Sequence, residues 1–215
     1  MHDNLAKKYD KIAEGFTEKS YANLSFYMHR RFILATSWMC ALQAGDSVLE
    51  LGCGDGYLAE MFARHGFSYS GVDISSNMVA IAERCLQLAG LSANFAVADV
   101  NKMVVKEPYD AIISYMRAFF SYVQEPLTVL KHLRSYVRKK LIVDLNPRGR
   151  FSLHEAIAIM HAAGFQDVMW RPFFVPIQRH IPHWLLHLLI SSEDVPLVRS
   201  IPLRWKFHCL LQGRP

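Results

Sequence analysis

The sequence predicts an α/β fold in which a mostly parallel, doubly wound, seven-stranded sheet is covered by helices on both faces. From residue 45 onward, short apolar runs of strand length alternate with amphipathic segments of helix length. The apolar runs are nearly uninterrupted, which is typical of strands buried on both faces. Of the 215 residues, 52% are hydrophobic and 20% are charged. This composition suits one globular domain with a sizeable core.

Residues 1–44 are expected to form an N-terminal helical lid. Apolar residues recur there at helical spacing, first at Leu5, Tyr9, Ile12 and Phe16. A longer helical run is expected over 25–42. Gly45 and Asp46 then break the helical pattern.

Residues 45–175 are expected to form the core of the domain. Strands are expected at 48–51, 69–72, 94–98, 111–115, 141–145 and 168–174. Helices are expected between them at 57–64, 76–88, 126–136 and 153–163. Ser75 or Ser76 would cap the second of these helices, and Pro126 opens the third. Alternation of this kind predicts a parallel sheet.

Residues 176–204 break this rhythm and are expected to form a helical insertion before a closing strand at 205–215. The insertion contains the apolar stretch I-P-H-W-L-L-H-L-L-I at 181–190. Two interpretations remain open for it. The segment either caps whatever the sheet binds, or is a helix that simply packs on the sheet.

The bulk charge and the cysteines narrow the class of protein. The formal charge is +5, and the densest basic stretch lies at 134–150, where it forms either an ordinary solvated surface or a patch that faces a partner. Four widely spaced cysteines predict neither a disulfide scaffold nor a zinc cluster. No secretory signal is visible, and no apolar run reaches the ~18 residues of a membrane span. We therefore expect a cytoplasmic protein.

The stretch S-V-L-E-L-G-C-G-D-G at 47–56 places a glycine-rich turn after the first strand. Such turns usually bind phosphate, but this one carries Glu50 and Asp55 and no lysine. Its third glycine also comes one residue too early for the dinucleotide fingerprint. Carboxylates would repel a pyrophosphate by ~1 to 4 kcal/mol per pair at ~4 Å. The turn therefore favours a nucleoside that carries positive charge.

Four motifs in the same order resemble those of the class I S-adenosylmethionine-dependent methyltransferases. They are V-L-E-L-G-C-G-D-G (48–56), G-V-D-I-S-S-N-M (71–78), F-A-V-A-D-V (95–100) and Y-D-A-I-I-S (109–114). The resemblance covers about half of the chain. Y-D-K-I-A-E-G-F (9–16) and A-G-F (163–165) are similar to the small-molecule branch of that family. The resemblance to this family implies a Rossmann-like fold and S-adenosylmethionine as cofactor, with S-adenosylhomocysteine as product.

The resemblance also implies a set of cofactor-binding residues. Glu50 would anchor the site near the methionyl end of the cofactor, and Asp73 would accept hydrogen bonds from both ribose hydroxyls. Asp99 would accept a hydrogen bond from the adenine amine, and Ser114 would face the methyl donor. The rest of the expected set surrounds the nucleoside: Tyr21, Gly52, Cys53, Gly54, Ile74, Met78 and Val100.

Residues that act on the acceptor are harder to find from the sequence. The candidates are His29, Tyr115 and the pair His183 and His187, which would share a helix face. The histidine pair has no nearby acidic ligand, and we expect no metal. A dry pocket and close positioning would serve methyl transfer to a small, rather apolar acceptor, with oxygen favoured and nitrogen or carbon also open.

Other functions stay open on the sequence alone. One alternative is an RNA or protein methyltransferase that uses the basic 134–150 stretch, although RNA is not favoured and no DNA partner is expected. Another is a cofactor-binding subunit that transfers no methyl group. Peripheral membrane association through 181–206 is also open, and it is compatible with the small-molecule methyltransferase. The sequence leaves the choice between monomer and homodimer open.

Overall fold

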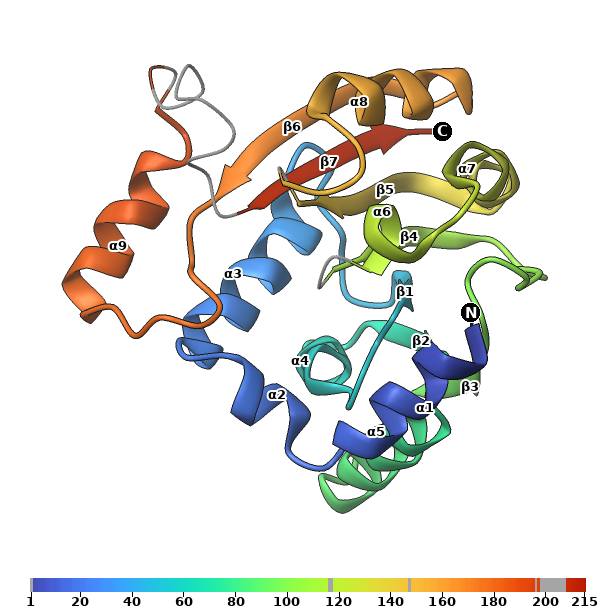
Figure 1. The fold of residues 1–215 in the computed structure, drawn as a ribbon, viewed down its shortest axis with the longest axis vertical. Helices are drawn as coiled ribbons and strands as arrows, with labels where there is room; N and C mark the ends of the chain where they lie inside the picture. Colours follow the sequence, from blue (N-terminus) through green and yellow to red (C-terminus); the bar gives the residue numbers. More distant parts are fainter. Residues whose placement is uncertain (1, 116–117, 147, 196, 198–207) are drawn as a thin grey trace.

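A single seven-stranded sheet forms the centre of the computed structural model, which describes residues 2–115, 118–146, 148–195, 197 and 208–215. The strand order is β3-β2-β1-β4-β5-β7-β6 (Figure 1). The strands are β1 (Ser47–Leu51), β2 (Ser68–Asp73), β3 (Asn94–Val97), β4 (Tyr109–Ser114), β5 (Val137–Leu145), β6 (Gln166–Phe173) and β7 (His208–Arg214). Only β7 runs antiparallel, against both β5 and β6. The predicted fold class, a mostly parallel sheet of seven strands, is confirmed.

Helices cover both faces of this sheet (Figure 1). They are α1 (His2–Ile12), α2 (Phe16–Ser20), α3 (Leu24–Ser37), α4 (Tyr57–Arg64), α5 (Ser76–Leu88), α6 (Ala118–Tyr122), α7 (Pro126–Arg134), α8 (Leu153–Ala162) and α9 (His183–Ser192). Successive strand residues point to opposite faces, as Val48 and Leu49 do. One face packs against α3, α4 and α5, and the other against α6, α7 and α8.

The strand order places the ligand crevice. The chain passes from β1 to β2 and β3 on one side, then crosses over to β4 and β5 on the other side of β1. In open α/β sheets, ligands bind beyond the carboxyl ends of the strands at such a reversal. The segments that follow β1, β2 and β4 therefore surround the expected site.

The N-terminal segment differs from the prediction in one respect. The helical spacing predicts one helix through Phe16, but the chain breaks after Ile12 and restarts as α2. Gly15 stands at the break with φ 63°, a left-handed conformation that glycine adopts without strain. This break lets α2 turn away from α1.

Two further differences concern short or partly described elements. The helix expected to run to residue 42 ends at Ser37, and α6 was not predicted because a five-residue helix leaves too short a pattern. Of the closing strand expected at 205–215, β7 is seen from His208. Residues 205–207 lie outside the described residues, as does most of 196–204.

Helix α9 lies at one end of the molecule, beside α3 (Figure 1). Arg30 of α3 donates two hydrogen bonds to the fully buried Glu193, at 2.9 Å and 2.7 Å. Arg171 of β6 lies 3.7 Å from the same carboxylate. These ion pairs fix the end of α9 to the sheet. Among the helices that the structure describes, none combines the length and apolar character needed to cross a lipid bilayer.

Candidate functional site

A cavity of about 770 Å³ opens at the carboxyl edge of the sheet. Its lower wall comes from the segments after β1, β2 and β3, and its cover comes from α1, α2 and the 177–180 segment. Eight of the predicted cofactor residues line it: Tyr21, Gly52, Gly54, Asp73, Ile74, Met78, Asp99 and Val100. The structure therefore brings together residues that are up to 79 positions apart in the sequence (100 minus 21).

The glycine-rich turn uses its second and third glycines for different purposes. Gly54 has φ 56°, and a Cβ added there would meet no protein atom within 4 Å. Because Gly54 lines the cavity, that open space belongs to the ligand. A Cβ added at Gly56 would come within 2.7 Å of the Ala82 Cβ, so this glycine lets α4 pack closely on α5. The early third glycine thus serves helix packing.

Asp73 ends β2 and holds the turn in place. Its Oδ2 accepts a hydrogen bond from the Gly54 N–H at 2.9 Å, and its Oδ1 accepts one from the Ser75 N–H at 2.9 Å. Burial raises the pKa of the Asp73 carboxyl, and these two donors partly oppose that effect. Each carboxylate oxygen has a second lone pair. The carboxylate can therefore accept two further hydrogen bonds from a diol in the cavity.

The adenine side of the cavity combines apolar and acidic groups. Met78 lies in the first turn of α5, which Ser75 caps by accepting the Met78 N–H at 3.1 Å. Asp99 follows β3, and its Oδ1 accepts hydrogen bonds from the backbone N–H and the side-chain amide of Asn101, both at 2.9 Å. The apolar Ile74 and Val100 complete this wall. A flat heterocycle with an exocyclic amine fits such a slot.

Three predicted cofactor residues lie behind the cavity wall. Glu50 is 1% exposed, and its carboxyl group accepts a 2.5 Å hydrogen bond from the Tyr69 hydroxyl. Burial raises the pKa of Glu50 to about 8. The Cys53 side chain is buried against Gly71, and the Ser114 hydroxyl is buried and donates to the Leu51 carbonyl at 3.1 Å. None of the three lines the cavity. Their contact with the cofactor stays a prediction.

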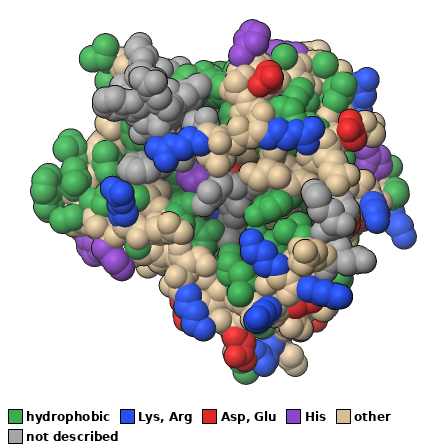
Figure 2. Space-filling view, viewed as in Figure 1, with side chains coloured by type: hydrophobic (Ala, Val, Ile, Leu, Met, Phe, Trp, Pro, Cys, Tyr) green, Lys and Arg blue, Asp and Glu red, His purple; other side chains and the backbone are tan. Residues whose placement is uncertain are grey.

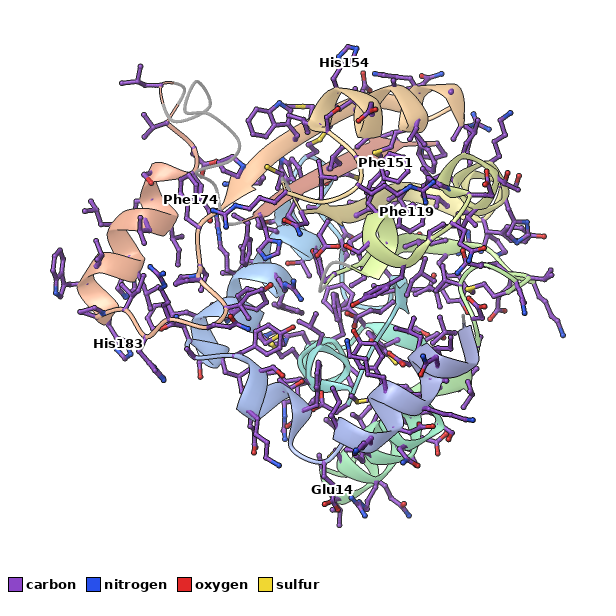
Figure 3. The ribbon with its side chains drawn as sticks, in the orientation of Figure 1. Glu14, Phe119, Phe151, His154, Phe174 and His183 are labelled. Atoms are coloured by element: carbon purple, nitrogen blue, oxygen red, sulfur yellow. The ribbon has the colours of Figure 1, made fainter. Side chains whose placement is uncertain are left out.

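The four predicted catalytic residues also lie elsewhere. His29 lines a separate shallow hollow with Tyr57 and Arg64. His183 and His187 pack on Phe26 at centroid distances of 4.9 Å and 5.1 Å, and His183 sits at the outer end of α9 (Figure 3).

Tyr115 is fully buried, and its hydroxyl donates to the Arg31 carbonyl at 3.2 Å. None of these four residues is among those that line the cavity. The three histidines lie on α3 and α9, and Tyr115 follows β4 into the packed core. Within the described part of the chain, no three His, Cys, Asp or Glu side chains gather closely enough to hold a metal ion.

His180 lines the cavity instead, on the segment between β6 and α9. Asn23 fixes this segment, since its side-chain amide donates to the carbonyls of Pro176 at 3.0 Å and Arg179 at 2.7 Å. The Asn23 Oδ1 accepts the Ile181 N–H at 3.3 Å. The sequence analysis does not single out His180, because the Asn23 contacts that hold its segment span more than 150 residues.

Two acidic residues hold the cover of the cavity closed. Asp10 of α1 accepts hydrogen bonds from the Ser75 hydroxyl at 2.6 Å and the Asn77 N–H at 3.1 Å. Asp55 of the glycine-rich turn accepts the N–H of Thr17 in α2 at 3.0 Å, and the Thr17 hydroxyl also donates to it. Both contacts join the cover directly to the ligand-facing loops.

Comparison with known proteins gives a consistent result. Residues 48–140 match the family model described as a methyltransferase domain. A ubiquinone biosynthesis O-methyltransferase from Xanthomonas euvesicatoria is 22% identical over 177 residues, which cover 80% of this chain and 72% of the relative. A malonyl-acyl-carrier-protein O-methyltransferase from Bacillus cytotoxicus is 28% identical over 113 residues, or 51% of this chain and 38% of the relative. The chain thus spans well under half of the second relative's length.

Solved structures share the fold. The cyclase SpnF aligns with a TM-score of 0.71 and 16% identity, covering 100% of this chain and 96% of that one. A magnesium protoporphyrin IX methyltransferase from Synechocystis PCC 6803 with bound S-adenosylmethionine aligns with a TM-score of 0.57 and 20% identity, covering 80% of this chain and 71% of that one. At these identities the likeness concerns the fold alone.

Proposed function

We propose that this chain, whose residues 48–140 match a methyltransferase domain, is a class I S-adenosylmethionine-dependent methyltransferase that transfers a methyl group to a small, rather apolar acceptor inside the cavity. Oxygen is the favoured acceptor atom. The observation that carries the proposal is the lining of one cavity by two sets of residues. The glycine-rich turn, Asp73 and Asp99 form one side, and α1, α2 and the 177–180 segment form the other. The first set suits a nucleoside, and the second leaves room for an acceptor.

The cofactor, when bound, supplies a methyl group activated on a sulfonium centre. In the proposed arrangement the Asp73 carboxylate accepts hydrogen bonds from the ribose hydroxyls, and Ile74 and Met78 flank the adenine. Asp99 accepts a hydrogen bond from the adenine amine. Gly52 and Gly54 leave the backbone open to the ligand where a side chain would clash.

We propose that the cover limits the access of water to the cavity. Leu5, Ile12 and Phe16 present apolar side chains to it from α1 and α2. A dry cavity favours a reaction in which the charges of a sulfonium and an anionic nucleophile disappear together. We therefore propose that residues 1–44 act as a lid and that part of 176–204 acts as a cap.

His180 is the proposed general base on the acceptor side. It lines the cavity, and an imidazole nitrogen can take the proton from an acceptor hydroxyl. A positioned base typically contributes ~100 to 10,000-fold when the acceptor must lose a proton. Replacement by Asn or Gln should therefore lower kcat with an acceptor hydroxyl and leave cofactor affinity intact.

Isothermal titration with S-adenosylhomocysteine, NAD and ATP tests the cofactor assignment. We expect binding of S-adenosylhomocysteine alone, and tight uptake of NAD or ATP would contradict the proposal. Turnover on a panel of phenols, carboxylates and amines with radiolabelled methyl donor then tests the activity. Cofactor binding without turnover across that panel would favour a non-catalytic subunit, and salt-sensitive tRNA binding would favour an RNA substrate.

The outer side of α9 supports a weaker proposal, contact with a membrane surface. Trp184 is 69% exposed and Leu188 is 60% exposed, and hydrophobic side chains gather at this end of the molecule (Figure 2). A cytoplasmic location and membrane association both stay predictions. Co-sedimentation with anionic vesicles tests the second, with Trp184→Ala/Leu188→Ala as the variant that should reduce it.

A further inference from the structure

Arg31 is a buried cation that the proposed reaction does not use. It lies on α3 and is 1% exposed. Its guanidinium carbon lies 4.2 Å from the ring centre of Tyr27, 4.9 Å from that of Tyr115 and 5.9 Å from that of Phe173. Its Nη2 donates to the Tyr27 hydroxyl at 2.6 Å. The charge therefore sits in an aromatic cage without solvent.

The donors of this guanidinium are largely unmet. Its Nε and Nη1 have no hydrogen-bond partner within the part of the chain that the structure describes. The Asp144 carboxylate lies 3.9 Å from Nη2, which is an ion-pair distance but too long for a hydrogen bond. Arginine stays charged in proteins, and a buried donor without a partner costs free energy. Such a group needs an explanation.

The position of Arg31 relative to the cavity suggests why a buried cation is present. The Tyr21 ring lines the cavity and packs on the Tyr27 ring at a centroid distance of 4.7 Å. Because Tyr27 in turn contacts Arg31, the Tyr21 and Tyr27 rings both stand between the cavity and Arg31 along these contacts. Tyr115 directly follows β4, and Asp144 lies near the end of β5.

The proposed nucleoside contacts follow β1, β2 and β3 instead. The strand order separates these two groups on either side of β1. Arg31 is therefore on the side left for the acceptor.

We propose that Arg31 binds an anionic oxygen of the acceptor, a carboxylate or a phenolate, when the Tyr21 and Tyr27 rings turn aside. This inference rests on the proposed function, because it assigns the acceptor to the same cavity. An anion would satisfy the open N–H groups in a medium where charged hydrogen bonds are strong. An acceptor with a positive charge would be repelled. The buried guanidinium behind the aromatic rings would thus favour acceptors that carry a negative charge.

Two ligands of nearly equal shape but different charge test whether the site prefers an anion. Benzoate and benzamide differ in charge but little in size, and each is titrated into the protein saturated with S-adenosylhomocysteine. We expect benzoate to bind roughly 10- to 100-fold more tightly, which is the usual effect of a hydrogen bond to a charged group. Arg31→Met should abolish the preference, Arg31→Lys should restore part of it, and the exposed Arg64→Met should retain it.

A second titration, with a phenol, distinguishes a carboxylate site from a phenolate site. 4-Nitrophenol is titrated above and below its ionisation point, with benzoate as the reference that is charged at both pH values. Binding that appears only with the ionised phenol assigns a phenolate site, and binding of benzoate alone assigns a carboxylate site. Equal binding of benzoate and benzamide by the native protein would overturn the inference.

A spectroscopic readout covers the case in which Arg31→Met does not fold. The Nε–H resonance of Arg31 in arginine-labelled native protein should shift on addition of benzoate and stay in place with benzamide. A purely structural Arg31 would change the melting temperature when replaced but would not change the benzoate preference. Loss of S-adenosylhomocysteine binding would contradict the proposed function, whereas normal cofactor binding without anion preference contradicts only this inference.

Discussion

The backbone N–H of Gly54 donates to the Asp73 carboxylate at 2.9 Å. This contact joins the turn after β1 to the end of β2, which are neighbouring parallel strands. It orients the carboxylate toward the cavity before any ligand arrives. The Asp73 side chain is therefore already ordered in the folded protein, and ligand binding loses less conformational entropy there.

Asp73→Asn keeps the size of the side chain and removes its charge. The amide can still accept from Gly54 or from a ribose hydroxyl, but not as strongly as the carboxylate. A hydrogen bond to a charged group contributes about 1.5–3 kcal/mol, so S-adenosylhomocysteine affinity should fall roughly 10- to 100-fold. Calorimetry measures this directly. Glu60→Gln, which alters an exposed pair with Arg64, is the matched control, and equal losses in both variants would refute the assignment of Asp73.

Gly54→Ala and Gly56→Ala should separate binding from stability. An alanine at 54 projects into the cavity and should weaken cofactor binding, with a left-handed backbone penalty of about 1–2 kcal/mol. An alanine at 56 has the same penalty and also clashes with Ala82, so its overpacking should cost about 1–3 kcal/mol more. Thermal melts should thus show the larger loss for Gly56→Ala. A larger loss of cofactor affinity in Gly56→Ala, among folded protein, would show that the two roles are exchanged.

The cofactor side of the cavity follows from the sequence because its residues sit next to strand ends. An apolar run that stops at Gly52 or Asp73 locates both the strand and the side chain at the edge of the sheet. The Glu50 and Ser114 side chains are buried, because a strand's last residues alternate between the cavity and the packed interior, and their contact with the cofactor stays a prediction. Sequence spacing alone does not tell whether a given side chain faces the cavity or the packed interior.

The acceptor side does not follow from the sequence for a different reason. The spacing of His183 and His187 predicts that they share a helix face, but not which way that face turns. His180 reaches the cavity through Asn23, at the other end of the chain. Contacts over such separations leave no local pattern.

Asn23→Ala should loosen this cap. It removes three hydrogen bonds to the 176–181 segment and leaves the buried Pro176 carbonyl without its partner, at about 1–3 kcal/mol. Hydrogen exchange of 176–181 should accelerate, and turnover should fall more than cofactor affinity. Asn77→Ala removes a side-chain bond of similar length to the Asp10 carbonyl on the opposite side of the cavity, and it should leave exchange of 176–181 unchanged. If exchange of the segment is unaltered in Asn23→Ala, Asn23 does not hold it.

Asp10 should make the docking of α1 depend on pH in the acid range. The Ser75 hydroxyl, and then the Asn77 N–H, lower the pKa of the Asp10 carboxyl below its usual 3.8. A lowered pKa means that the contact is complete above pH 3.8 and is lost as the pH falls through the folded value. The protection of α1 amides, which is the intrinsic exchange rate divided by the observed rate at the same pH, should therefore fall in native protein only below that pH. In Asp10→Asn the protection should already be lower at pH 7, and it should lack that acid step.

Glu50 should produce the opposite dependence at higher pH. Burial raises its folded pKa to about 8 from an ordinary 4.5, so the folded state keeps a proton that the unfolded state has lost between those values. Stability must then fall as the pH rises from 4.5 toward 8, by up to about 1.4 kcal/mol per pH unit, and level off above 8. Glu50→Gln cannot ionise, and it should flatten the melting-temperature profile over that window while still binding cofactor. A profile of equal slope in both proteins would show that Glu50 is ionised in the fold, and that its carboxylate is held by Tyr69 and Arg31 together.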